Sequence, residues 1–210
     1  LADARAVGMD DRSELALDHI EGLTRLTLLE RLADANDGRD AVGQRLLRDQ
    51  SKAGGGPRWL ALTSQPNKRA ALRALGAVAL IGNLDRPSTL RRLAGLAHRI
   101  VHLAPPPSEG KQDRRTRNLA AILPRHGTLV YVSTTGVYGD CGGACFDETR
   151  PVAPVNARAR RRVDAEQVLR RWARRSQSRL SILRVPGIYA ANRLPVERLT
   201  QGTPALSAAD

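Results

Sequence analysis

The chain has 210 residues and a formal net charge of +13. Hydrophobic residues make up 41% of it, enough for the core of one domain, but only 3% are aromatic, so that core must be aliphatic. The positive charge is almost entirely arginine and is spread along predicted helices instead of one tail. Because no nucleic-acid-binding motif accompanies it, we do not expect nucleic acid to be the partner.

The cysteines and the hydropathy pattern narrow the class further. Cys141 and Cys145 lie close together in a glycine-rich stretch without a nearby histidine, so we predict neither a disulfide framework nor a metal site. No secretory signal is visible, and no apolar run approaches the ~20 residues of a membrane span. We therefore expect a cytoplasmic protein with no membrane contact; its oligomeric state is not predicted.

Along the chain, residues 1–39 contain an apolar patch at 23–29 but no clean buried strand. From residue 42 onward, helices and strands alternate. In chain order we expect a helix beginning at 42–48, a turn at 52–57, a strand at 59–63, a helix at 68–75, a strand at 78–81 and a helix at 88–97 capped by Ser88. A strand at 100–104, a helix at 114–123, a strand at 129–133, a helix at 158–174 and a strand at 180–185 follow.

This alternation predicts βαβ units and a doubly wound parallel sheet of the α/β class, covered by helices on both faces. Ligands of such sheets bind beyond the carboxyl ends of the strands. In this chain those ends are small, polar or glycine-bearing, as in residues 63–65 (TSQ), 82–85 (GNLD) and 133–135 (STT). The sequence therefore predicts a nucleotide crevice at this edge.

Several motifs in register carry a family resemblance. Residues 132–140 (VSTTGVYGD), 147–154 (DETRPVAP) and 183–189 (LRVPGIY), with His102-Leu103-Ala104 before them, resemble extended short-chain dehydrogenases, the NAD-dependent epimerase and dehydratase group. The resemblance covers roughly residues 42–199 and is nearest to the atypical, epimerase-like subgroup. It implies a Rossmann-like fold that binds a dinucleotide and a small-molecule substrate.

The catalytic motif departs from that family. Its members use a Ser or Thr, a Tyr and a Lys four residues after the Tyr. Alignment through residues 165–167 places Arg158 at the tyrosine position and Arg162 at the lysine position. Arginine stays protonated, so Arg158 is a poor general base. Thr134 matches the hydroxyl position, and Tyr138 is the remaining candidate for an acid or base; these two are the predicted catalytic residues.

The dinucleotide fingerprint also departs. The best candidate is residues 38–43 (GRDAVG), in which Gly38 and Gly43 fit the first and last glycines but Asp40 takes the middle place. Its carboxylate would face the phosphates unfavourably. We interpret residues 1–39 as a divergent N-terminal segment, or a misread version of the family's first strand.

The cofactor type is predicted from the end of the second family strand. An Asp or Glu there indicates NAD, whereas this chain has Thr63 and Ser64, followed by Lys68 and Arg69, which suits a 2′-phosphate and favours NADP over NAD. An ordinary strand end with solvated charges is the alternative. The full set of predicted cofactor-binding residues is Gly38, Gly43, Thr63, Ser64, Arg69, Asn83, Leu84, Ala104, Pro105, Ser133 and Arg162.

The remaining polar residues have simpler interpretations. His102 is expected to be a packed core histidine, and residues 158–162 a solvated helix face rather than a phosphate clamp. We expect residues 40–192 to form the nucleotide-binding domain and 193–210 to begin a substrate-binding region that is largely truncated.

Two hypotheses of different class follow. The first is an NADP-dependent oxidoreductase or epimerase-like enzyme of unknown substrate. The second is a non-catalytic nucleotide-binding or regulatory protein that kept the fold and lost the chemistry. Loss of the Tyr-Lys pair favours the second, and retention of the TTGVYG turn favours the first. A nucleic-acid-associated protein is a weaker third.

Overall fold

A single parallel sheet organises the molecule. The computed structural model describes residues 25–29, 38–52, 58–188 and 200. Six strands lie in the order β3-β2-β1-β4-β5-β6, and every neighbouring pair is parallel. The strands are β1 (Arg25–Leu29), β2 (Arg58–Thr63), β3 (Val78–Ile81), β4 (Arg99–His102), β5 (Thr128–Thr134) and β6 (Arg179–Val185). The predicted doubly wound α/β sheet is confirmed.

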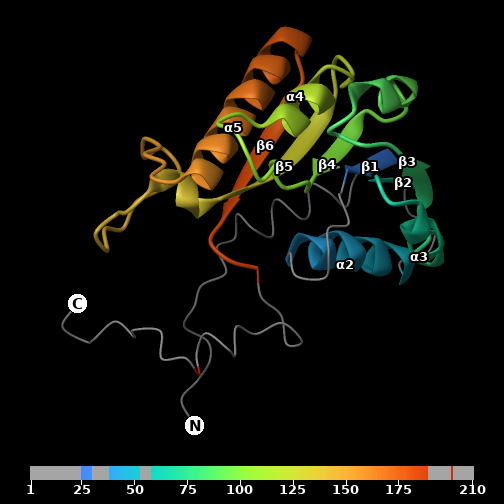
Figure 1. The fold of residues 1–210 in the computed structure, drawn as a ribbon, viewed down its shortest axis with the longest axis horizontal. Coiled ribbons are helices and arrows are strands. Elements are labelled where there is room, and N and C mark those ends of the chain that lie inside the picture. The colour runs from blue at the N-terminus through green and yellow to red at the C-terminus, as the bar shows by residue number, and fades with distance from the viewer. Residues whose placement is uncertain (1–24, 30–37, 53–57, 189–199, 201–210) are drawn as a thin grey trace.

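Helices cover both faces of this sheet (Figure 1). They are α2 (Gly38–Lys52) and α3 (Arg69–Ala74) on one side, and α4 (Arg114–Ala120) and α5 (Ala157–Ser176) on the other. Because successive strand residues point to opposite faces, Val130 packs with Leu47 of α2, and Leu129 packs with Leu119 of α4. The strands are apolar on both faces for this reason, which explains why they read as continuous hydrophobic runs.

The first strand corrects the interpretation of the N-terminal segment. We expected no strand before residue 40, yet β1 pairs with β2 on one side and with β4 on the other. Its sequence, RLTLL, looks amphipathic and too short in isolation. A central position in a parallel sheet supplies hydrogen-bond partners on both edges, which local propensity does not reveal. The sheet therefore begins at Arg25, not at residue 40.

The segment between β3 and β4 is a second correction. The predicted helix at 88–97 is wrong: the chain forms only two 3₁₀ turns, Pro87–Thr89 and Arg91–Leu93. Ser88 does not cap a helix, since it lies inside the first turn. Gly95, at φ 75°, breaks the helical path before a third turn can form. The crossover between β3 and β4 therefore covers less of the sheet than the predicted helix would.

The longest helix begins and ends as its sequence suggests. The Asn156 side chain caps the start of α5 by accepting a hydrogen bond from the Ala159 amide at 2.8 Å. Gln177, in the left-handed conformation, ends it. The apolar stripe of Ala165, Leu169 and Trp172 packs on the sheet. In the part of the chain that the structure describes, no helix is long and apolar enough to cross a membrane.

Candidate functional site

The strand order reverses between β1 and β4, and in such sheets this is where ligands bind. β5 and the 3₁₀ turn that follows it, Thr135–Tyr138, carry both predicted catalytic residues to this edge. Thr134 is half-buried, and its Oγ1 accepts a hydrogen bond from the Gly136 amide at 3.3 Å. That bond shapes the turn, so the threonine has a local structural role whatever else it does.

Tyr138 is buried and held by a cation. Its hydroxyl lies 2.6 Å from Nη1 of Arg184, which donates to it, and the same guanidinium sits 4.7 Å from the centre of the tyrosine ring. Phe146 packs edge-on against the other side at 4.8 Å. Arg184 also donates to the Glu148 carbonyl oxygen at 3.3 Å. Tyr138 is therefore fixed in position by β6 and by the loop that follows its own turn.

Glu166 of α5 organises this edge and was missed by the sequence analysis. It is fully buried. Its carboxylate accepts hydrogen bonds from Arg184 at 2.8 and 3.2 Å, from Ser133 Oγ at 2.7 Å and from Arg170 at 3.1 Å. The sequence signal for this role was a glutamate next to Ala165 in an otherwise apolar stripe. A carboxylate is buried in such a stripe only when it has partners, so this glutamate indicates buried hydrogen-bond donors nearby.

Glu166 and Arg184 each shift the pKa of the other. Burial alone raises the pKa of Glu166, but hydrogen bonds from Arg184 and Ser133 and the charges of Arg184 and Arg170 outweigh it, so the pKa lies below its ordinary value. The hydrogen bond to Glu166 is in turn the main reason that the pKa of Arg184 is raised. The two shifts both favour the charged forms of Glu166 and Arg184.

Arg162, expected at the lysine position, points into the protein. It is fully buried, and its Nη1 donates to the Tyr131 hydroxyl at 2.7 Å and to the Val132 carbonyl at 3.2 Å. Arg161 is also buried and donates to the Gly110 carbonyl. The expected solvated face is therefore wrong for these two residues, although Arg158 and Arg160 are exposed. Helical rotation of 100° per residue turns Arg162 toward β5 and Arg161 toward the loop that contains Gly110.

Beside Arg162 lies a buried polar chain. His102 Nε2 is 2.9 Å from Thr116 Oγ1, which donates to Asp113 Oδ2 at 2.9 Å. Asp113 also caps α4 by accepting from the Thr116 amide. Burial raises the pKa of Asp113, against the hydrogen bonds from Thr116 and the charges of Arg162 and Arg115. The core position expected for His102 is confirmed, since its ring is fully buried.

Arg115 contacts both the loop after β3 and the loop after β4. Arg115 of α4 pairs with the Asp85 carboxylate at 2.8 and 2.9 Å, and its Nη1 donates to the carbonyls of Pro105 and Pro106. Leu84 is buried, and its carbonyl oxygen accepts from Asn118 at 2.7 Å. The loops after β3 and β4 are therefore positioned by α4, a connection that no local pattern shows.

The residues predicted to bind a 2′-phosphate differ in burial. Thr63 is fully buried, and its Oγ1 accepts from the Gln65 amide at 3.1 Å. Ser64 is half-buried, while Arg69 at the start of α3 is exposed. Asn83 Oδ1 accepts from the Asp85 amide at 2.8 Å and so shapes its turn. Ser64 and Arg69 remain the accessible candidates.

The glycine fingerprint is described only in part. Helix α2 begins at Gly38, and Gly43 is buried one turn later. Residues 30–37, between β1 and α2, lie outside the described residues. The geometry that Asp40 imposes on a phosphate therefore stays a prediction. Ala104, by contrast, is fully buried and Pro105 half-buried at the end of β4, beside the strand-order reversal.

One observation bears on whether a dinucleotide fits. Of the buried side-chain nitrogens of Arg162, Nε and Nη2 have no hydrogen-bond partner among the described residues. Unpaired buried donors are costly, and hydroxyl groups of a bound ribose are the kind of acceptor that would satisfy them. The binding of a cofactor ribose by Arg162 stays a prediction. Among the described residues there is no cluster of His, Cys, Asp or Glu that suits a metal ion.

The strand order, the reversal between β1 and β4 and the polar edge define a Rossmann-like, doubly wound protein. The model of the NAD dependent epimerase/dehydratase family matches residues 39–207. The chain belongs to this family, as its motifs indicated. A search of curated protein sequences gave no match.

Several solved structures share the fold of this chain. A conserved protein of unknown function from Silicibacter pomeroyi DSS aligns with 32% identity and a TM-score of 0.59, over 82% of this chain and 56% of that one. UDP-glucuronic acid 4-epimerase from Bacillus cereus, in complex with NAD, aligns with 16% identity and a TM-score of 0.58, over 85% of this chain and 64% of that one.

A short-chain dehydrogenase/reductase superfamily protein from Agrobacterium tumefaciens with bound NAD aligns with 18% identity and a TM-score of 0.55, over 76% of this chain and 48% of the other. The chain therefore spans between about half and two thirds of the length of these structures. At identities below 25%, the likeness of the last two concerns the fold.

Proposed function

We propose that this chain is the nucleotide-binding part of an NAD(P)-dependent, epimerase-like oxidoreductase acting on a small molecule. The observation that carries the proposal is the edge at β5 and β6, where Glu166 joins Ser133 to the Arg184–Tyr138 pair. Burying two charges costs free energy that their attraction offsets only when the geometry is good and further hydrogen bonds satisfy the remaining polar atoms. Here those hydrogen bonds come from Ser133, a predicted cofactor-binding residue, while Arg184 also donates to Tyr138, the candidate proton-transfer group.

The cofactor would be held by residues on several elements. The nicotinamide ring accepts or gives a hydride when the cofactor is bound. Ser133 and Arg162 would hold its ribose, Asn83, Leu84, Ala104 and Pro105 would line the adenosine side, and Gly38 and Gly43 would admit the pyrophosphate at the start of α2. We propose that the nucleotide-binding unit runs from β1 to about residue 192, with residues 193–210 in a substrate region.

Tyr138 is the proposed proton donor and acceptor, with Thr134 as the hydroxyl that orients the substrate. Arg184 donates a charge-assisted hydrogen bond to the Tyr138 hydroxyl, which fixes the position of that oxygen. Arg158 stands where relatives carry the tyrosine, so in this proposal the proton-transfer group comes from the 3₁₀ turn after β5 and not from α5.

We infer NADP as the preferred cofactor. Arg69 is exposed at the start of α3, with Ser64 half-buried at the end of β2, and no carboxylate lies between residues 58 and 84. A cation and a hydroxyl favour a 2′-phosphate over a free ribose hydroxyl. We also propose a cytoplasmic location.

A non-catalytic nucleotide-binding protein is the second candidate. The firm hold of Arg184 on Tyr138 favours it, since the hydroxyl is already engaged and the ring is buried. The two candidates share the binding crevice and differ only in proton transfer. Binding and turnover must therefore be measured separately.

The test is a fluorescence titration of the purified chain with NADPH and NADH. We expect saturable binding of both, with NADPH about tenfold tighter. Arg69→Glu should remove this preference, and Arg91→Glu, an exposed change on the other crossover, is the matched control. Binding of neither cofactor would contradict the proposal. Binding that survives Tyr138→Phe while hydride exchange with candidate substrates is lost would separate the enzyme from the non-catalytic protein.

A further inference from the structure

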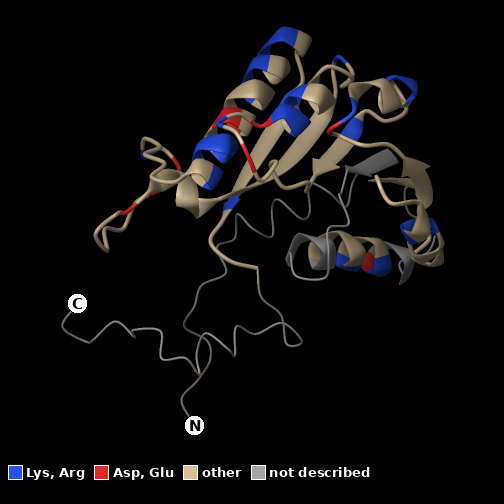
Figure 2. Ribbon diagram, viewed as in Figure 1, with Lys and Arg blue, Asp and Glu red and all other residues tan. Residues whose placement is uncertain are grey.

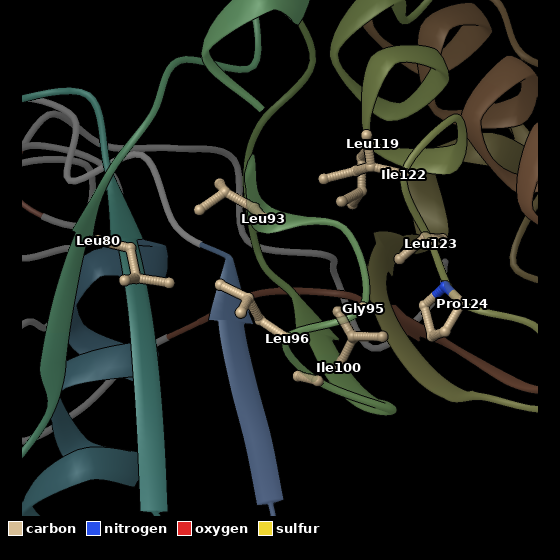
Figure 3. Close-up of a pocket in the computed structure, with 10 residues that line it drawn as sticks. Leu80, Leu93, Gly95, Leu96, Ile100, Leu119, Ile122, Leu123 and Pro124 are labelled. Carbon is tan, nitrogen blue, oxygen red and sulfur yellow. The ribbon is translucent and has the colours of Figure 1, made fainter. Parts of the chain in front are cut away.

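A small apolar hollow lies on the α4 side of the sheet, away from the proposed crevice residues. Figure 3 shows side chains from β3, the β3–β4 crossover, β4 and the end of α4 converging on it. Its volume is about 30 Å³. Its lining consists of Leu80, Leu93, Gly95, Leu96, Ala97, Ile100, Leu119, Ile122, Leu123 and Pro124, without one polar side chain.

The hollow exists because the crossover is short. Two 3₁₀ turns replace the expected helix, so no aliphatic helix face closes over Leu80 and Ile122. Both of these side chains remain half-buried, and Leu96 at the rim is 46% exposed. Few large hydrophobic side chains are exposed elsewhere in the described residues, so this cluster is unusual for the molecule.

The segments that line the hollow carry basic residues and no acidic ones. Residues 86–104 and 114–128, which contribute most of its lining, include arginines and histidines but not one carboxylate. Arg91 and Arg125 are exposed and directly adjoin lining segments. Figure 2 shows Lys and Arg along α4 and on the segment between β3 and β4. An apolar centre with a polar, charged rim is the usual anatomy of a protein interface.

We propose that this hollow receives an aliphatic side chain from an acidic segment of a partner protein. A volume of about 30 Å³ is far below the ~150 Å³ that admits a benzene ring, so only the end of a side chain fits. Carboxylates on either side of that anchor would pair with the basic residues of these segments. This surface is independent of the proposed nucleotide crevice.

Charge and shape select this occupant over two others. A second copy would bring equally basic segments and be repelled, since the chain carries a net charge of +13. A membrane surface is bound by apolar side chains that protrude into it, whereas these ten residues line a recess. An acidic segment with a leucine or isoleucine meets both requirements.

The test uses the whole chain and a short, fluorescein-labelled peptide of alternating leucine and glutamate pairs. We expect saturable binding by fluorescence anisotropy, weakened at least tenfold by Leu96→Glu. Val155→Glu is the matched control, because Val155 is also an exposed aliphatic residue, at 68%, but lies before α5. Circular dichroism of each variant verifies that the fold is kept, and Leu96→Ala provides a milder second variant with an expected effect of a few-fold.

Three results would overturn the proposal. The first is equal weakening by Leu96→Glu and Val155→Glu, which means unspecific attraction of the acidic peptide. The second is equal weakening by paired Arg91→Gln, Arg125→Gln and by paired Arg160→Gln, Arg175→Gln, which are exposed changes on α5. The third is no peptide binding with Leu96-dependent binding to phosphatidylglycerol vesicles, which assigns the surface to a membrane.

Discussion

Glu166 is the residue on which the candidate site depends most. It contacts β5 through Ser133, β6 through Arg184 and its own helix through Arg170. Arg184 then reaches Tyr138 and the loop carbonyl of Glu148. Removing one member of a buried pair leaves the other charge without compensation, which costs more than the pair itself contributes.

We therefore predict that Glu166→Gln lowers the free energy of unfolding near neutral pH by about 3 kcal/mol. Because the folded-state pKa of Glu166 is lowered, its contribution is fully present above the ordinary value of 4.5 and is lost as pH falls through the folded pKa. The difference between wild type and variant should consequently shrink in acid. Urea unfolding across a pH series measures it.

The control for this prediction is Glu109→Gln, a change of the same kind at an exposed position. We expect a change within about 0.5 kcal/mol. If the two variants behaved alike, Glu166 would not be the group that holds this edge together.

At the scale of elements, the turn after β5 is fixed by a close backbone approach. Gly139 ends the 3₁₀ turn with φ 74° and ψ −150°, a region open only to glycine. A Cβ there would lie 2.3 Å from the Ala153 carbonyl oxygen. The Ala153 amide donates to the Val137 carbonyl, so this approach ties the following loop to the Tyr138 turn.

Gly139→Ala should lower the free energy of unfolding by about 3 kcal/mol, since it adds a steric clash to backbone strain. Gly142→Ala is its matched control: φ is also positive, at 57°, but nothing lies within 4 Å of the added Cβ. We expect about 1 kcal/mol there. Equal losses in thermal or urea unfolding would mean that the contact with Ala153 contributes nothing.

Over the whole molecule, positive charges outnumber negative charges. Thirty-four lysines and arginines face 21 aspartates and glutamates, and many of the arginines are exposed along α5. Like charges at this density repel in the compact state more than in the extended one. Salt screens such exposed charges and leaves buried pairs such as Glu166–Arg184 almost unaffected.

We predict that raising sodium chloride from low to physiological concentration increases the free energy of unfolding by about 1 kcal/mol. Urea unfolding at several salt concentrations measures this, with potassium chloride as the control for ion-specific effects. A decrease would show that surface ion pairs, which salt weakens, outweigh the repulsion.

The sequence by itself determined the fold class, the family and most element positions. Apolar runs bounded by glycine and proline predicted β2 to β6 within one or two residues, and the apolar stripe of Ala165, Val168, Leu169 and Trp172 predicted α5. These features are local, so periodicity and turn chemistry are sufficient to reveal them. The TTGVYG turn likewise led to the edge that carries Thr134 and Tyr138.

Only the tertiary structure decided which side chains meet. Glu166 and Ser133 are 33 residues apart, Arg115 and Asp85 are 30 apart, and Arg184 and Tyr138 are 46 apart. The tertiary structure also decided two elements. β1 is a strand because β2 and β4 pair with it, and residues 88–97 do not form the predicted helix. Partners brought together by chain reversal leave no periodic trace in the sequence, since their pairing energy depends on burial and geometry that only the assembled sheet provides.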